Sequence, residues 1–241
     1  MRTNVLGVEF DDFTIDTAAL FAYEKIQNGE KTYAVTPNPE IVWLSRKNEP
    51  LRNALNNAGL VLADGIGIVI GAKILGTPLT GGRVPGIDFI AVLLDKLASS
   101  GGSVFLLGAK PGVAQIAGEK LIDKHKGLII AGTADGYFTD SNALVDKINS
   151  ANPDLLLVCL GAPKQELWMS ENLLRLNVPL CAGLGGSLDV FAGNVKRAPV
   201  FFQRLGLEWL YRIVKEPKRL KRSLSLPLFV FRVILQRIFG K

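Results

Sequence analysis

The sequence predicts an α/β fold: a Rossmann-like parallel sheet with helices on both faces, plus a C-terminal helical appendage. Strand-like apolar runs alternate with helix-like segments along most of the 241 residues. Several runs, of which residues 154–160 are the clearest, are apolar almost throughout, as is typical of parallel strands that are buried on both faces. A content of 48% apolar residues with 25 glycines suits a well-packed core of this class.

Each expected element has its own sequence signal. Apolar runs bounded by turn residues predict strands at residues 3–10, 31–35, 60–62, 104–107, 128–131, 154–160 and 179–182. Apolar residues at helical spacing predict helices at residues 16–28, 39–57, 66–74, 85–100, 140–150, 166–176 and 201–215, and others after Gly112, Pro217 and Pro227. Pro50 is expected to interrupt the helix at 39–57, and Asn38 to cap its start.

The charge is divided unevenly along the chain, at about residue 195. The net charge is +6, yet residues 196–241 hold 12 basic and two acidic side chains, whereas residues 1–195 hold 16 basic and 20 acidic ones. We therefore expect an α/β domain over residues 1–195 and a basic, apolar helical appendage over residues 196–241. A basic appendage favours an anionic partner, which can be nucleic acid or a membrane surface.

The last stretch, LFVFRVILQRIFG after Pro227, is apolar but carries Arg232 and Arg237. It is too short and too charged to span a bilayer, and too apolar for a solvated helix, which favours a helix lying in the membrane interface. A helix docked on the core or on another subunit is the alternative. Nucleic acid is disfavoured as a partner because the appendage contains no recognisable binding module.

The cysteines and the N-terminal residues favour an intracellular location. Cys159 and Cys181 are the only cysteines, and each lies in an apolar run, as buried thiols of a reducing compartment do. The N-terminal residues lack the apolar segment of a secretory signal, and no uncharged apolar run reaches the length of a transmembrane helix. We expect a cytoplasmic protein that is peripheral on the inner face of the cell membrane.

The stretch from Gly59 to Gly86 is expected to organise the functional site. A short strand ends at Asp64-Gly65, a helix follows, and a loop rich in glycine and proline carries Arg83. Because ligands of open parallel sheets bind at the carboxyl edge, Asp64 and Arg83 are candidates for acting on an anionic substrate. A helix cap is the alternative role for Asp64, and spacing alone does not distinguish the two.

The chemistry available to this chain is that of carboxylates, amides and arginines placed after strands. His125 is the single histidine, expected to be solvated at the end of a lysine-rich helix, so neither a metal site nor a Ser-His-Asp triad is predicted. The glycine fingerprint of dinucleotide-binding proteins is missing, and no cofactor is expected. Metal-independent transfer from a nucleotide sugar, with a carboxylate taking a proton and arginines stabilising a diphosphate, fits this set.

Several segments together resemble the WecG/TagA/CpsF glycosyltransferase family. They occur in one order between Thr36 and Arg222: TPNPEIV, LADGIGIVIGAKILGTPL, RVPGIDF, VFLLGAKPGVA, GTADGYF, PDLLLVCLGAPKQELW, GGSLDVFAGNVKRAP and LGLEWLYRIVKEPKRLKR. The resemblance implies a distinct Rossmann-like fold and a C-terminal appendage that is used at the membrane. It also implies inverting transfer of N-acetylmannosamine from UDP to the C4 hydroxyl of N-acetylglucosaminyl-diphospho-undecaprenol, in wall teichoic acid linkage-unit synthesis.

The resemblance further implies roles for individual residues. Asp64 matches the proposed general base, and Thr36 and Asn38 match a polar pair near the donor sugar or acceptor, with a turn and a cap as their alternative roles. The other matches for substrate binding are Arg83 and Gln165 in the pocket and Arg212, Arg219 and Arg222 on the appendage. The appendage arginines would close over the site and face diphosphate groups, whereas lipid-facing positions are the alternative for Arg212 and Arg219.

Four points stay open at the level of sequence. The family pattern has an acidic residue directly before the pocket arginine, whereas Gly82 stands there in this chain, so the placement of Arg83 is undecided. Gln165 and Glu166 could be a solvated first helical turn. The donor could instead be UDP-N-acetylmannosaminuronic acid. From another class, the chain could be a non-catalytic nucleotide-binding regulator that assembles into oligomers, and a homo-oligomer is also open for the transferase.

Overall fold

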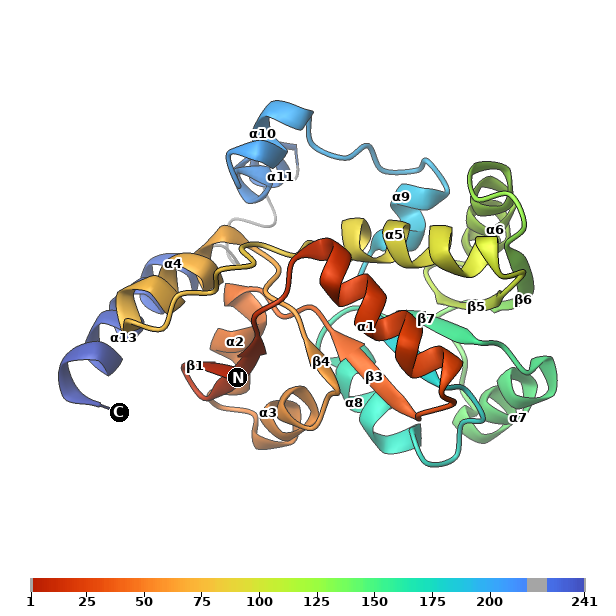
Figure 1. Cartoon of the computed structure of the whole chain (residues 1–241), viewed down its shortest axis with the longest axis horizontal. Coiled ribbons are helices and arrows are strands. Elements are labelled where there is room, and N and C mark those ends of the chain that lie inside the picture. Colours follow the sequence, from red (N-terminus) through yellow and green to blue (C-terminus); the bar gives the residue numbers. More distant parts are fainter. Residues whose placement is uncertain (1, 216–224, 241) are drawn as a thin grey trace.

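A six-stranded, all-parallel sheet forms the centre of the computed structural model, which describes residues 2–215 and 225–240 (Figure 1). The predicted α/β fold is therefore confirmed. The strands are β3 (Thr32–Val35), β4 (Leu60–Val61), β5 (Ser103–Gly108), β6 (Ile129–Ala134), β7 (Leu155–Cys159) and β8 (Leu180–Gly183). They lie in the order β4-β3-β8-β7-β5-β6, and each neighbouring pair is parallel.

Helices cover both faces of this sheet, and each face has its own apolar core. One core is shared with α1 (Ile15–Gln27), α5 (Gly86–Ser99), α6 (Val113–Lys124) and α9 (Ser187–Phe191). The other is shared with α2 (Pro39–Ser45), α3 (Glu49–Asn56), α4 (Ile66–Leu75), α7 (Ser141–Ala151) and α8 (Lys164–Asn172). In β7, Leu155 and Leu157 join the first core and Leu156 and Val158 the second, because successive strand side chains point to opposite faces.

The single strand predicted at residues 3–10 is wrong, because this segment folds as a hairpin. Strands β1 (Arg2–Val5) and β2 (Val8–Asp11) pair antiparallel in a separate two-stranded sheet. Leu6 and Gly7 form the turn with φ angles of 52° and 88°. Two-residue hairpin turns require such positive φ values, and Gly7 supplies one of them without a steric cost.

Two of the expected long helices are divided. The helical stretch at residues 39–57 breaks between α2 and α3 as predicted, with Pro50 in the first turn of α3. The stretch at 201–215 was expected to be one helix but is two, α10 (Val200–Arg204) and α11 (Glu208–Lys215). Gly206, with a φ angle of 69°, separates them, because a left-handed residue ends a helix. The start of the helix expected at Pro217 lies outside the described residues.

The C-terminal helix α13 (Ser225–Phe239) docks on the body of the protein by one face. Its Phe229 and Val233 side chains are 0% exposed and belong to the second core. Figure 1 shows α13 alongside α4, and the Phe229 ring lies against Gly71 of that helix, where a Cβ atom would come within 3.4 Å of the ring. This face of α13 therefore matches the alternative considered from the sequence, in which the last helix docks on the core.

Polar contacts fix the far end of α13, while its other face stays apolar and exposed. The Leu6 N–H donates to Gln236 Oε1 at 3.0 Å, and Arg237 Nη1 donates to the Leu75 carbonyl at 2.9 Å. Large apolar side chains that point outward include Phe231, which is 59% exposed, and Ile238, which is 64% exposed. Within residues 2–215 and 225–240, no helix combines the length and the apolar character that crossing a membrane requires.

Candidate functional site

A cavity of about 660 Å³ opens at the carboxyl edge of the sheet, between the strand tips and the appendage. Loops after β3, β4, β7 and β8 form its floor, and residues 194–197 and α11 contribute to its other wall. The chain leaves β3 for α2 and α3 on one face of the sheet, whereas it leaves the neighbouring β8 for α9 on the other face. Open parallel sheets bind ligands between neighbouring strands whose connections go to opposite faces, so the fold itself favours a site here.

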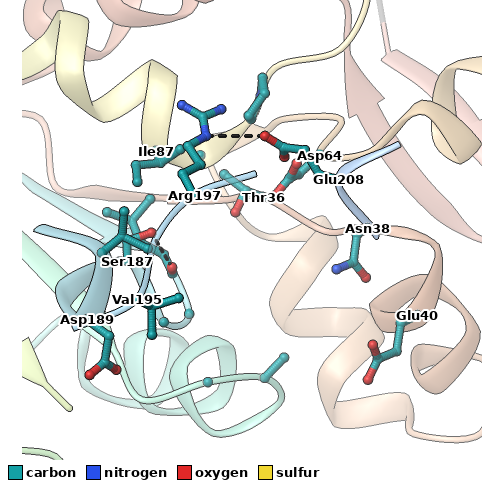
Figure 2. A pocket seen from close by; sticks show the side chains of 18 of the residues that line it. Thr36, Asn38, Glu40, Asp64, Ile87, Ser187, Asp189, Val195, Arg197 and Glu208 are labelled. Carbon is teal, nitrogen blue, oxygen red and sulfur yellow. Dashed lines mark hydrogen bonds and ion pairs between the residues drawn. The ribbon is translucent and has the colours of Figure 1, made fainter. Parts of the chain in front are cut away.

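Asp64 lies in this cavity, directly after β4. Its backbone N–H faces the Pro37 carbonyl, with 3.4 Å between nitrogen and oxygen, which joins the β4 tip to the β3 tip. Gly65, with a φ angle of 115°, occupies the N-cap position of α4, so Asp64 precedes the cap. Figure 2 shows the Asp64 carboxylate at the side of the cavity that also holds Thr36, Arg197 and Glu208.

Thr36 and Asn38 line the same cavity from the loop after β3. The Thr36 hydroxyl donates to the Gly183 carbonyl at 3.2 Å, which ties the tip of β3 to that of β8. Asn38 caps α2 by accepting a hydrogen bond from the Ile41 N–H at 3.0 Å, so the cap alternative is correct for its oxygen. Figure 2 shows the Asn38 amide at the cavity wall opposite Ser187 and Asp189, where its nitrogen can still donate to a ligand.

Gln165 and Glu166 are buried, which excludes the solvated helical turn as their description. Gln165 is 3% exposed and Glu166 is 1% exposed, at the start of α8. Gln165 Oε1 accepts from the Gly185 N–H at 2.8 Å, and its Nε2 donates to Glu166 Oε1 at 2.8 Å. Burial raises the pKa of the Glu166 carboxyl above its ordinary value, and the hydrogen bond from Gln165 opposes that shift only in part.

Arg83 contacts the appendage, and it is not among the described residues that line the cavity. Its Nη2 donates to the Gln203 carbonyl at 3.0 Å, and its Nη1 lies 3.4 Å from Glu208 Oε2. Gly82 before it has a φ angle of 77°, a turn that a bulkier residue would strain. The loop thus directs Arg83 toward α10 and α11, and its predicted contact with substrate stays a prediction.

Arg197 connects the Glu208 carboxylate, which Arg83 also contacts, to Asp88 of α5. The sequence analysis did not single out Arg197. Its Nη2 donates to Asp88 Oδ2 at 2.7 Å, and its Nε donates to Glu208 Oε1 at 3.2 Å, the contact drawn in Figure 2. The hydrogen bond to Asp88 is the first cause of a raised pKa for the guanidinium. Arg83, Asp88, Arg197 and Glu208, which we call the appendage network, hold two positive and two negative charges.

The appendage therefore reaches the cavity, but partly through residues that the sequence did not indicate. Lys196, Arg197, Glu208, Tyr211 and Lys215 all line it. Lys196 and Arg197 lie inside the motif GGSLDVFAGNVKRAP, so that signal was present but unassigned. Of the predicted appendage arginines, Arg212 lies within α11, while its side chain is not described, and Arg219 and Arg222 lie outside the described residues.

His125 is buried, so its predicted exposure to solvent is wrong. The residue is 2% exposed at the end of α6, and its Nδ1 lies 2.6 Å from Asp95 Oδ1 of α5. It closes the contact between these two helices and is absent from the cavity wall. Among the described residues there is also no group of three His, Cys, Asp or Glu side chains arranged to hold a metal ion.

Comparison with known proteins shows to which family this chain belongs. Residues 3–241 match the model of the glycosyl transferase WecG/TagA/CpsF family. Similar proteins from Bacillus spizizenii and Staphylococcus aureus are both named N-acetylglucosaminyldiphosphoundecaprenol N-acetyl-beta-D-mannosaminyltransferase. The first is 39% identical over 87% of this chain and 81% of its own length, and the second is 32% identical over 96% and 92%. This chain therefore belongs to the WecG/TagA/CpsF family of glycosyl transferases, and it is an enzyme of that class.

Proposed function

We propose that this protein transfers N-acetylmannosamine from UDP-N-acetylmannosamine to the C4 hydroxyl of N-acetylglucosaminyl-diphospho-undecaprenol, with inversion, in wall teichoic acid linkage-unit synthesis. The names of the relatives support the acceptor and the transferred sugar. The single observation that carries the proposal is the position of Asp64 at the β4 tip, in a cavity whose other wall bears cationic appendage residues. A base and cations that face each other across one cavity suit the attack of a hydroxyl on a nucleotide sugar.

In the proposed reaction the C4 oxygen of the acceptor attacks the anomeric carbon of the donor sugar. The bond from that carbon to the UDP oxygen breaks, and the proton of the hydroxyl passes to the Asp64 carboxylate. Negative charge then grows on the departing diphosphate, and Lys196 and Lys215, which line the cavity, can stabilise it. We assign the same role to Arg212, Arg219 and Arg222, because guanidinium groups match phosphate geometry.

A turnover assay tests this proposal directly. The full-length protein is incubated with a short-chain acceptor analogue and either UDP-N-acetylmannosamine or UDP-N-acetylmannosaminuronic acid, and the product linkage is determined by NMR. We expect faster turnover of the first donor and a β-1,4 product. Faster turnover of the uronic acid donor would reassign the substrate, and tight UDP binding without any product would favour a non-catalytic regulator.

We expect a chelator to leave this turnover unchanged. In the proposed reaction the charge of the leaving group is neutralised by side chains, so no divalent ion is required. The assay is repeated in excess EDTA, with a magnesium-dependent nucleotidyltransferase as the matched control that must lose activity. Loss of sugar transfer that returns when magnesium is added back would contradict the proposed role of the appendage cations.

We also propose that the exposed face of α13 brings the enzyme to the membrane that holds its acceptor. Apolar side chains beside Arg232 suit an interfacial helix on an anionic surface. The change Phe231→Glu should abolish flotation with anionic vesicles and leave the melting temperature unchanged, because this ring is 59% exposed. Phe229→Ala, a change in the buried face, should instead cost about 3 kcal/mol of stability. Unchanged flotation of the first variant would refute the contact.

A further inference from the structure

The buried carboxyl of Glu166 is joined to the cavity wall by a short chain of hydrogen bonds. Glu166 Oε1 accepts from Gln165 Nε2, and Gln165 Oε1 accepts from the Gly185 N–H. Gly185 belongs to the loop at residues 184–187, which follows β8 and lines the cavity. Glu166 itself is not among the described residues that line the cavity, whereas Gln165, to which it is hydrogen-bonded, is one of them.

The Gln165 amide lies in a tight space with a donor on one side and an acceptor on the other. A Cβ atom added at Gly183 would come within 3.1 Å of Gln165 Nε2, so the amide packs against the β8 backbone. The Gly185 N–H requires an acceptor, and the Gln165 nitrogen requires one as well. Glu166 satisfies the second requirement, which holds the amide with its oxygen toward Gly185.

We propose that Glu166 is a positioning residue that holds the cavity loop at residues 184–187 in place through Gln165, and that it does so as a neutral carboxylic acid. The charge state follows from the surroundings of the group. Glu166 is 1% exposed, and its Oε2 has no hydrogen-bond partner among the described residues. An ionised carboxylate with one bare oxygen would be costly to bury, whereas the acid form leaves only a neutral O–H without a partner, which costs much less.

Among the described residues, no cation forms an ion pair with Glu166. Helix α8 packs mainly against α3, β3, β7 and β8. Its Trp168 also donates to Ser141 of α7, a helix whose charged residues, Asp146 and Lys147, are exposed. The titratable groups on the three strands are Tyr33, Cys159 and Cys181, and burial raises the pKa of each, so that all three are neutral at pH 7. On α3, Glu49 is exposed and Arg52 lies against Gly7 of the N-terminal hairpin. On α8 itself, Lys164 donates to the Gly136 carbonyl and Glu171 is exposed.

The stability of the variant Glu166→Gln tests the charge state without any reference to catalysis. Above about pH 4.5, the ordinary value for the carboxyl, the unfolded chain releases the proton that the folded chain retains. Wild-type stability therefore falls as the pH rises through the raised folded pKa, and the glutamine variant lacks this loss. We expect the melting temperature of the variant minus that of the wild type to increase from pH 4 to pH 8. If this difference in melting temperature stays constant or decreases with pH, the proposal that Glu166 is a neutral acid in the folded protein is refuted.

Turnover tests the positioning role, and this arm rests on the proposed transferase activity. Glu166→Met, which removes the acceptor, should lower kcat/KM by about 10-fold, because small misplacements in a site are costly. Gln165→Met should have a similar effect, and the double variant should be no worse than either single variant. Glu166→Gln, which keeps an acceptor oxygen, should rescue most of the loss. Additive effects of the two single changes, or a Glu166→Gln variant as impaired as Glu166→Met, would refute the proposal that Glu166 positions the loop through Gln165.

Discussion

Replacing Asp64 with asparagine should lower kcat of sugar transfer by about 100- to 10,000-fold, the range expected when a general base is removed. The amide has nearly the size of the carboxylate but cannot accept the proton of the acceptor hydroxyl. Because Asp64 precedes the N-cap position of α4, the change should leave the helix intact. The measurement is single-turnover transfer to a short-chain acceptor, together with UDP affinity by calorimetry, which we expect to change little.

Asp189 provides the matched control for this experiment. Its carboxylate lines the same cavity, on the side opposite Asn38 and Glu40 in Figure 2. Asp189→Asn removes the same charge from the same space, but at a place away from the β4 tip. Equal losses in kcat for the two variants would mean that cavity charge in general matters, and Asp64 would then lose its assignment as the base.

Replacing Arg197 with methionine should detach the α10–α11 segment from the body of the protein. The change leaves Asp88 without the guanidinium that its carboxylate contacts and removes one of two cations beside Glu208. The Arg197 side chain is 21% exposed, so solvent screens part of the effect, and we expect a loss of about 1–3 kcal/mol. Hydrogen exchange of the amides at residues 200–215 should accelerate accordingly.

Turnover should fall in the same variant because the appendage forms part of the cavity wall. We expect kcat/KM to decrease by about 10-fold or more when that wall is displaced. Lys196→Met, at the neighbouring position in the cavity wall, removes one positive charge outside the appendage network. This variant is the control for the hydrogen-exchange experiment, in which it should not accelerate exchange at residues 200–215. A double-mutant cycle of Arg197→Met with Glu208→Gln measures the coupling free energy between these two side chains. Unchanged exchange at residues 200–215 in the Arg197 variant would show that the network does not hold the segment.

The sheet was predictable because its strands carry their signal locally. Runs such as residues 154–160 are apolar at almost every position, and only a strand buried on both faces uses such a run at that length. The position of Asp64 in the cavity followed from the same logic, since ligands of parallel sheets bind at the carboxyl edge, whereas Thr36 and Asn38 were expected there from the family resemblance. The order of the strands was not predictable, because it depends on pairings between distant segments.

The errors arise where long-range contacts decide the outcome. Glutamate is usually exposed and histidine is intermediate, and nothing in the sequence near His125 or Glu166 shows that these two side chains become buried. The contact of Arg83 with Glu208 was likewise not visible in the sequence, because the two residues lie 125 positions apart along the chain, and its contact with substrate stays a prediction. The hairpin at residues 2–11 was missed because its turn, Leu6-Gly7, is not among the dipeptides that mark such turns most clearly.

The docking of α13 on α4 has a practical consequence for work with shortened proteins. Helix α4 is about 15 Å long. It begins two residues after Asp64, the proposed base, and ends at Leu75, whose carbonyl accepts a hydrogen bond from Arg237. A chain trimmed before residue 225 loses the Phe229 ring that packs against Gly71 of this helix. Low activity in such a truncated protein would then have two possible origins: loss of the proposed lipid contact, and weaker support of α4 behind Asp64, the proposed base. Point changes on the outer face of α13 separate them.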